Sequence, residues 1–289
     1  MKTKVWVPNG MPCALTLDVH GYNLREWEAC NSQTKVLFLN LMPEKAMTEM
    51  DIVRTLTDCS VACQIIPIKI RGQKYKTTPQ SHMDAFYLDF DDVEGSYFER
   101  MIITGAPLEQ MPFEDVRYWK QLQHIMHWAD EHVRSTLYIC WGAQAGLYEH
   151  YGISKYPLND KMFGIFPQKV VKQDSPLMQN LSPTFFMPNS RHTEVRKADV
   201  LSKAKDGLQL LALSEESGVG VMVDETFRRV FIVGHLEYNA HTLDNEYKRD
   251  LSKSLPIKAP LYYYGEDGAP MYQWQKDAIT FYRNWLTLN

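Results

Sequence analysis

The amino-acid sequence predicts an α/β protein with a mostly parallel sheet, helices on both faces and a partly antiparallel extension. Apolar strands alternate with helical patterns as far as residue 152, as in βαβ units. Two of these strands end in a glycine-containing turn, as at the carboxyl edge of a parallel sheet. Between 164 and 235, strand patterns follow one another with little helix between them, which favours antiparallel pairing.

The individual elements follow from apolar runs and their boundaries. Continuous apolar runs, typical of strands buried on both faces, lie at 35–42, 63–70, 98–105 and 135–139. Helices with one apolar side are expected at 43–59, at 113–133 and from 141 onward. The extension is expected to use strands at 164–172, 184–190, 208–215, 218–225 and 228–235. Two further helices are expected at 242–255 and 271–286.

The composition is that of a globular protein able to bury a full core, with 289 residues, 45% hydrophobic and 23% charged. We expect a single α/β domain over 35–289, preceded by an irregular N-terminal arm over 1–34. A net charge of −4 without a basic cluster argues against nucleic acid as a partner. The N-terminus has no signal-peptide pattern and no apolar run reaches membrane-spanning length, so we expect a cytoplasmic protein that does not bind membranes.

The cysteines and histidines do not form a pattern typical of a metal site. Five cysteines at irregular spacings predict reduced thiols rather than a disulfide framework. Cys59 and Cys63 form one spaced pair and His124 and His127 another, but neither has a matching second pair. Because structural zinc needs four ligands, we expect no metal.

The stretch around Cys140 is the candidate catalytic centre. Residues 135–139 are typical of a strand, and the small residues after Trp141 allow a helix to start abruptly beside it. A side chain at such a corner faces the first N–H groups of the helix, as at the nucleophile elbow of hydrolases. Since the helix dipole favours an anion, we expect a lowered pKa and a nucleophilic thiolate at Cys140. The alternative is a small core cysteine.

His235 and Glu237 follow another apolar strand that ends in glycine. A thiol nucleophile needs an imidazole to accept and return protons, and the imidazole needs an acceptor on its other nitrogen. Catalytic groups in an open parallel sheet gather at the carboxyl ends of the strands, so Cys140, His235 and Glu237 are predicted to meet. The backbone N–H groups of Trp141 and of the turn after 98–105 are candidates for holding an oxyanion.

Six motifs distinguish the sequence: Leu-Asn-Leu-Met-Pro at 39–43, Thr-Gly-Ala-Pro at 104–107, Cys-Trp-Gly-Ala-Gln-Ala-Gly-Leu-Tyr at 140–148, Ser-Arg-His-Thr-Glu-Val at 190–195, Gly-His-x-Glu-Tyr at 234–238 and Glu-Tyr-x-Arg-Asp at 246–250. With them, the chain from Lys35 onward resembles the homoserine O-acyltransferases of bacterial methionine biosynthesis, often called homoserine O-succinyltransferases. The resemblance implies a flavodoxin-like fold similar to that of class I glutamine amidotransferases.

The resemblance also implies a reaction. An acyl group would pass from acyl-CoA to L-homoserine through an acyl-cysteine on Cys140, with His235 as proton acceptor, Glu237 behind it and no bound cofactor. Four further residues are implied in substrate binding: Lys161, Ser190, Arg249 and, near the acyl group, Lys45. A guanidinium fork matches carboxylate geometry, so Arg249 suits the α-carboxylate of the amino acid.

Glu109 bears on which acyl group is transferred. Within the family that the chain resembles, the residue after Thr-Gly-Ala-Pro-x helps choose the donor, glycine accompanying succinyl and glutamate accompanying acetyl. A carboxylate at this point would repel the free carboxylate of succinyl-CoA and fill its space. We therefore expect acetyl-CoA as the co-substrate.

The chain departs from the family pattern at Leu236, Asn239 and Asn189, where proline, aspartate and histidine are usual, and its N-terminal arm matches poorly. Homoserine and serine both remain open as acceptors, because they differ by one methylene, worth about 1–3 kcal/mol. Succinyl transfer is an alternative on the same scaffold. A glutaminase- or esterase-type hydrolase using the same triad is a more distant one, and a non-catalytic binding protein another. The aromatic C-terminal segment is compatible with a homodimer.

Overall fold

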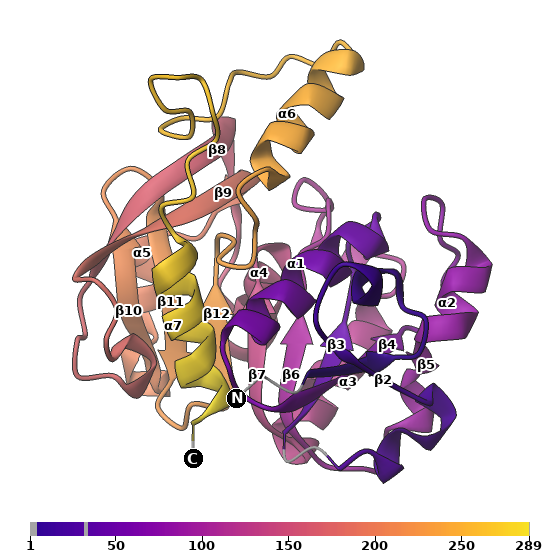
Figure 1. Ribbon diagram of the computed structural model, residues 1–289. Helices are drawn as coiled ribbons and strands as arrows, with labels where there is room; N and C mark the ends of the chain where they lie inside the picture. The colour runs from indigo at the N-terminus through magenta and orange to yellow at the C-terminus, as the bar shows by residue number, and fades with distance from the viewer. Residues whose placement is uncertain (1–4, 32–33, 289) are drawn as a thin grey trace.

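One sheet runs through residues 5–31 and 34–288, the part of the chain that the computed structural model describes. Its strands are β1 (Val5–Pro8), β2 (His20–Tyr22), β3 (Lys35–Leu39), β4 (Cys63–Lys69), β5 (Leu88–Asp89), β6 (Phe98–Ile103), β7 (Val133–Ile139), β8 (Tyr156–Val170), β9 (Thr184–Glu194), β10 (Leu208–Ser214), β11 (Gly218–Asp224) and β12 (Arg229–Ile232). Their order is β2-β1-β4-β3-β6-β7-β12-β11-β10-β8-β9, with β5 beside β4 (Figure 1).

The parallel part of the sheet is confirmed. β4, β3, β6, β7 and β12 are neighbours and run parallel. Their apolar side chains are buried on both faces, which is why the sequence shows continuous rather than alternating apolar runs. In the register of the last pair, Ile139 lies beside Ile232. The chain segments that follow these two strands therefore leave the same edge of the sheet side by side.

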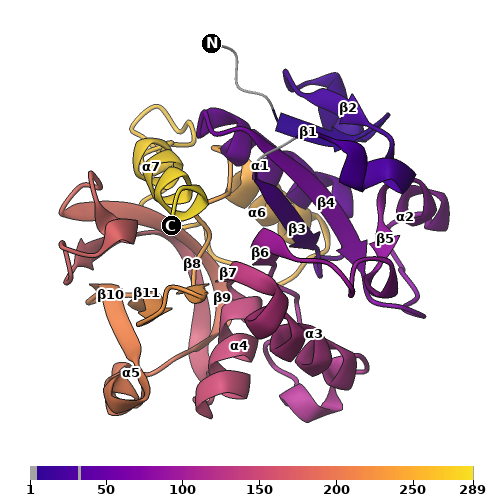
Figure 2. The same cartoon turned by 90° about the horizontal axis from the view of Figure 1, so that it is seen from below.

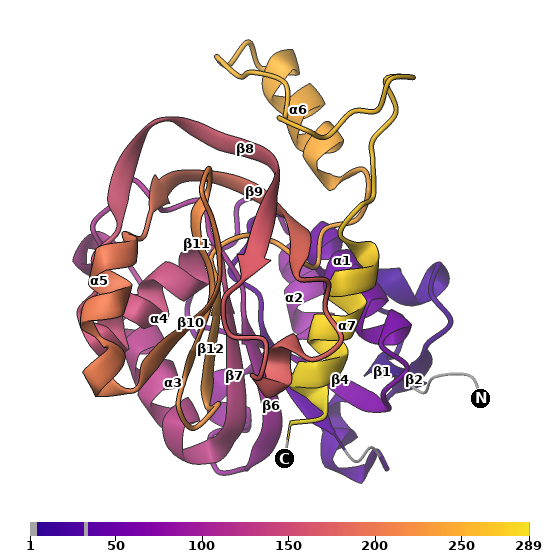
Figure 3. The ribbon, with the colours of Figure 1, turned by 90° about the vertical axis from the view of Figure 1, so that its left-hand side faces the viewer.

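The antiparallel extension is also confirmed. β11, β10, β8 and β9 join β12 as successive antiparallel neighbours. β8 and β9 are the longest of these strands and curve over the end of the sheet in the view of Figure 3. They carry polar residues from the extension toward the edge at which β7 and β12 end.

Helices cover both faces of the sheet, as expected. α1 (Lys45–Asp58) and α7 (Gln275–Leu286) lie on one face, and α3 (Trp119–His132), α4 (Trp141–Tyr151) and α5 (Lys197–Ser202) on the other (Figure 2). Two clusters of buried apolar side chains fill the two interfaces. α2 (Gln80–Phe86) lies near the β5 edge, and α6 (Thr242–Ser252) projects beyond the sheet (Figure 1). Among the described residues, no helix is long and apolar enough to span a membrane.

Some boundaries differ from those expected. Residues 113–115 form a 3₁₀ turn and α3 begins only at Trp119, because the backbone at Val116 is extended. α6 ends at Ser252, three residues early. These differences leave the elements around the edge of β7 and β12 unchanged.

The expectation that the N-terminal segment forms an irregular arm is wrong. β1 pairs parallel with β4, and β2 pairs parallel with β1, so both strands extend the sheet at its edge. The Tyr22 hydroxyl reaches inward and donates a hydrogen bond of 2.9 Å to the Ile65 carbonyl. Strands this short leave too few residues for a periodic pattern. Residues 1–4 and 32–33 of the expected arm lie outside the described residues, and the single domain over 35–289 stays a prediction.

Candidate active site

Cys140 occupies a sharp corner between β7 and α4. Its backbone has φ 54° and ψ −116°, a region that non-glycine residues rarely adopt and that is associated with functional sites. Neighbouring glycines make the corner possible. A Cβ on Gly142 would lie 2.7 Å from the Thr104 carbonyl oxygen, and one on Gly105 would lie 3.2 Å from the Cys140 Cβ. The turn after β6 therefore packs directly against the nucleophile elbow.

The same corner provides N–H groups near the sulfur. Trp141 is the first residue of α4, and the first N–H groups of a helix have no intrahelical acceptor. The space where Gly105 lacks a side chain lies 3.6 Å from both the Trp141 nitrogen and the Cys140 Sγ. A small oxyanion beside the sulfur would thus lie near the Trp141 N–H, as the sequence predicts.

His235 and Glu237 lie in the loop after β12, and both are buried. The His235 Nδ1 and a Glu237 Oε1 are 2.6 Å apart. The His235 backbone N–H donates a hydrogen bond of 2.8 Å to the Pro188 carbonyl of β9, and the Tyr238 ring stacks on the imidazole at 4.0 Å between centroids. These contacts fix both the position and the tilt of the ring.

The electrostatics favour a charged imidazole. Burial alone lowers the pKa of His235, but the Glu237 carboxylate and the Cys140 sulfur, by charge and hydrogen bonding, raise it by more. The pKa of His235 therefore lies well above its usual value. A protonated imidazole between a carboxylate and a cysteine sulfur is the arrangement that activates cysteine nucleophiles.

A cavity of about 840 Å³ opens beside this group. Its lining includes Cys140 and His235 from the parallel edge and Glu109 from the turn after β6. It also includes three residues that the family resemblance implies in substrate binding: Lys161, Ser190 and Arg249. One cavity thus brings together the candidate nucleophile, the candidate proton acceptor and cationic side chains.

The substrate-binding candidates converge on a residue that the sequence reading missed. The Glu246 Oε1 lies 2.6 Å from the Lys161 Nζ, 2.6 Å from the Ser190 Oγ and 3.7 Å from an Arg249 guanidinium nitrogen. Asp250, in turn, accepts a hydrogen bond of 2.8 Å from the Arg249 Nε. Glu246, Arg249 and Asp250 stand on one side of α6, and that i, i+3, i+4 spacing was the available signal.

Lys45 differs from the expectation that it serves the acyl group. Its side chain is buried, and its Nζ donates hydrogen bonds to the carbonyls of Asn40 (2.5 Å) and Met42 (2.8 Å). Burial lowers the pKa of Lys45 to about 8, against the opposing effect of Glu49. Met42 and Pro43 line the cavity, whereas Lys45 is absent from its described lining. The Lys45 ammonium group thus stabilises the backbone of the β3–α1 loop and does not line the cavity.

Glu109 is half-buried and lines the cavity, as a residue that selects the acyl group must. Its loop is held by Lys155, whose Nζ donates to the carbonyls of Leu108 (3.3 Å) and Met111 (2.5 Å). Burial lowers the pKa of Lys155 to about 8, although Glu109 and Glu114 act in the opposite direction. The Glu109 carboxylate is therefore presented on a supported loop.

One group of side chains among the described residues has ligand atoms close enough to hold a metal: His127, Asp130 and His150. Both carboxylate oxygens of Asp130 accept hydrogen bonds of 2.7 Å from Arg229. The guanidinium already satisfies that carboxylate, and its positive charge opposes a metal cation there. This group does not border the cavity.

Comparisons with known proteins find relatives over most of the chain. A sequence model of the homoserine O-succinyltransferase family matches residues 6–289, so the resemblance also covers the N-terminal segment. A homoserine O-acetyltransferase of Phocaeicola vulgatus is 49% identical over 255 residues, covering 87% of this chain and 83% of that protein. A homoserine O-acetyltransferase of Methanomethylophilus alvi is 42% identical over 287 residues, covering 97% and 92%.

Solved structures resemble the fold. A glutamine amidotransferase of Thermotoga maritima has a TM-score of 0.56 at 16% identity, covering 88% of this chain and 96% of that one. A glutamine amidotransferase of Methylobacillus flagellatus has a TM-score of 0.53 at 13% identity, covering 87% and 93%. The predicted class I glutamine amidotransferase-like fold is confirmed, and at these identities the likeness extends to the fold alone.

Proposed function

The chain belongs to the homoserine O-succinyltransferase family, and we propose that within it the protein is a homoserine O-acetyltransferase of methionine biosynthesis. The acetyl group passes from acetyl-CoA to the hydroxyl of L-homoserine through an acetyl-cysteine. The observation that carries this proposal is a single cavity that holds Cys140 and His235 on one side and Lys161, Ser190 and Arg249 on the other. A cysteine nucleophile with its own acid–base partner requires no bound cofactor.

The first half-reaction forms the acetyl-enzyme. The Cys140 thiolate attacks the thioester carbon of acetyl-CoA, and the Trp141 N–H stabilises the oxyanion. As the carbon–sulfur bond to CoA breaks, the His235 imidazolium gives its proton to the leaving thiolate. Acetylation removes the negative charge from the Cys140 sulfur, which is one of the causes of the raised pKa of His235. The neutral imidazole left behind is then a competent base.

The second half-reaction uses that base. His235 takes the proton of the homoserine hydroxyl, whose oxygen attacks the acetyl carbon, and Cys140 leaves again as a thiolate. Arg249 suits the α-carboxylate of the acceptor, and the Glu246 carboxylate suits its ammonium group. Lys161 and Ser190 hold Glu246 in place through the hydrogen bonds described above.

The donor preference rests on Glu109. Acetyl-CoA ends in a methyl group, whereas succinyl-CoA ends in a carboxylate that the half-buried Glu109 would repel. The names of the relatives from Phocaeicola vulgatus and Methanomethylophilus alvi support the same choice.

The test is a matrix of two donors and two acceptors. Release of CoA thiol and product mass are measured with acetyl-CoA or succinyl-CoA against homoserine or serine. We expect turnover to depend on homoserine and to be highest with acetyl-CoA, and intact mass without acceptor to show an acetyl-enzyme. CoA release that is equally fast without any amino acid would indicate a hydrolase and contradict the proposal.

A further inference from the structure

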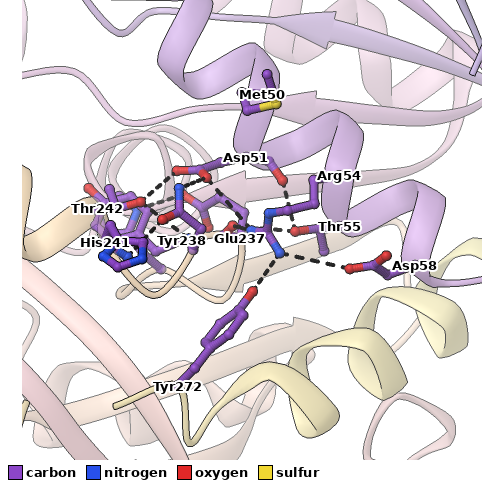
Figure 4. Close-up of polar contacts among 12 residues, drawn as sticks. Met50, Asp51, Arg54, Thr55, Asp58, Glu237, Tyr238, His241, Thr242 and Tyr272 are labelled. Atoms are coloured by element: carbon purple, nitrogen blue, oxygen red, sulfur yellow. Dashed lines mark hydrogen bonds and ion pairs between the residues drawn. The ribbon is translucent and has the colours of Figure 1, made fainter. Parts of the chain in front are cut away.

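A buried carboxylate ties the loop of His235 and Glu237 to helix α1. Asp51, on α1, is 4% exposed. One of its oxygens accepts a hydrogen bond of 2.6 Å from the Asn239 side-chain amide. The other accepts a hydrogen bond of 3.0 Å from the Thr242 hydroxyl (Figure 4). The two donors follow Glu237 by two and five positions. The hydrogen bonds to Asp51 therefore fasten the segment that comes directly after the triad carboxylate.

The next turn of α1 holds Glu237 itself. The Glu237 backbone carbonyl accepts hydrogen bonds from an Arg54 guanidinium nitrogen at 2.5 Å and from the Thr55 hydroxyl at 3.3 Å. Arg54 is oriented by Asp51, at 3.7 Å, and by the Tyr272 hydroxyl, at 2.5 Å (Figure 4). Because these contacts use the Glu237 backbone, the side chain is left to contact the His235 imidazole.

In the hydrogen bond between Asp51 and Asn239, the aspartate accepts and the asparagine donates. Burial raises the pKa of Asp51 to about 6, and Asn239, Arg54 and Thr242 act to lower it. Both carboxylate oxygens accept hydrogen bonds from these neighbours, as those of an ionised carboxylate do. An ionised carboxylate can only accept, and its partner must donate. Asn239 provides that donor through its side-chain amide. An aspartate here would place a second carboxylate in contact with Asp51.

We propose that Asp51 is a positioning residue for the His235–Glu237 pair, acting through the side chains of Asn239 and Thr242. The proposal rests on the function proposed above and adds a residue whose described hydrogen bonds go to the segment that follows Glu237. A displacement of the loop by about 1 Å would lengthen the 2.6 Å contact between His235 and Glu237, and misplacement of that size can lower a rate about 100-fold.

The experiment reverses the polarity of the pair. N239D sets two carboxylates against each other, and the double variant D51N/N239D restores one donor and one acceptor in the opposite order. D58N is the matched control. Asp58 also lies on α1, and one of its carboxylate oxygens is 3.9 Å from an Arg54 guanidinium nitrogen. Among the described hydrogen bonds, however, Asp58 contacts neither Asn239 nor Thr242. T242V removes one hydrogen bond to Asp51 and serves if N239D does not fold.

Two measurements are made on each protein. The first is kcat and KM for acetyl transfer to homoserine. The second is the pH dependence of iodoacetamide alkylation at Cys140, read on its peptide because Cys30 is also part-exposed. The alkylation profile reports the interaction of the thiolate with His235 and needs no acetyl transfer. It therefore remains informative even if the proposed function is wrong.

For N239D we expect kcat to fall about 100-fold with KM nearly constant, and half-maximal alkylation to move to higher pH. The double variant should recover kcat to within a few-fold, and D58N should match the unaltered protein. T242V should lower kcat several-fold with a smaller shift of the alkylation profile. An unchanged alkylation profile in N239D and T242V, or a folded double variant as impaired as N239D, would overturn the role of Asp51. Loss of acetyl transfer in every protein, with the expected alkylation profiles, would instead count against the proposed function alone.

Discussion

The two sides of the cavity are held in different ways. Cys140 lies at a sharp backbone corner between β7 and α4. The neighbouring glycines pack so closely against this corner that a side chain in place of either would crowd it. On the opposite side, Lys161, Ser190 and Arg249 are part-exposed or exposed and are held chiefly by one carboxylate, that of Glu246. The proposed nucleophile is thus fixed by packing of the main chain, and the proposed acceptor side by charges between side chains.

This difference teaches where each kind of change should act. The proposed acetyl-enzyme forms with groups on the rigid side alone, whereas the acceptor needs both sides. Substitutions on the two sides should therefore separate the two half-reactions. If substitutions on either side affected both half-reactions equally, this distinction between the two sides of the cavity would be wrong.

The largest effect is expected at the corner itself. C140A should abolish the acetyl-enzyme seen by intact mass and lower kcat at least about 10⁴-fold, since it removes the nucleophile. C30A, at the other part-exposed cysteine, is the control and should retain activity. Substantial turnover by C140A would end the covalent mechanism.

The next effect is expected on the charged side. R249M should raise KM for homoserine about 10- to 100-fold, because a hydrogen bond to a charged group contributes about 1.5–3 kcal/mol. The burst of CoA release in the absence of acceptor should keep its rate. K248M, one position earlier on α6 and with a side chain 70% exposed, is the matched control. A slower burst in R249M would show that the two sides are coupled before the acceptor binds.

The same contrast explains how much the sequence could predict. Cys140 and His235 could be found because each follows an apolar strand, and neighbouring parallel strands deliver their ends to one edge. The pairing of β1 and β2 could not be predicted, because strands of four and three residues carry no periodic signal. The parallel core and the antiparallel extension lie between these extremes. Most of their boundaries were predicted to within a few residues, but β8 begins at Tyr156, eight residues before the expected start.

The role of Glu246 lies beyond local pattern. Its partners Lys161 and Ser190 are 85 and 56 positions away, on β8 and β9, and only the curvature of those strands brings them to α6. The family resemblance suggested Lys161, Ser190 and Arg249 separately, without the carboxylate that joins them. Lys45 shows the converse case, because its place in a shared motif says nothing about which way its ammonium group faces.

A smaller effect is expected at Glu109, and it concerns the donor. E109G removes both the charge and the bulk, and should raise kcat/KM for succinyl-CoA about 10- to 100-fold by relieving repulsion of about 1–3 kcal/mol. E109Q keeps the bulk and removes only the charge. If charge decides, E109Q should recover much of the gain; if space decides, only E109G should. An unchanged donor preference in both variants would refute the argument from Glu109.

The smallest effect on activity is expected at Lys45, where the prediction concerns stability. The pKa of this lysine is lowered from 10.5 to about 8 in the folded state by burial. Between these values the unfolded chain binds one more proton, so the free energy of unfolding should rise with pH over this window, by about 3 kcal/mol in all. K45M lacks this contribution, and K248M controls for the loss of an exposed lysine. Denaturant titrations from pH 7 to pH 10 measure the difference between each variant and the unaltered protein.

The K45M variant also tests whether Lys45 supports the β3–α1 loop or contacts the acyl donor. If its ammonium group holds the β3–α1 loop from behind, as the hydrogen bonds to Asn40 and Met42 indicate, K45M should lose less than about tenfold in kcat/KM, because no substrate contact is removed. If the group instead faces the acyl donor, KM for acetyl-CoA should rise about 10- to 100-fold, the size of a lost charged hydrogen bond. The pH dependence of stability would then be the same in K45M as in the unaltered protein, because a group exposed to the donor site would not have its pKa lowered by burial.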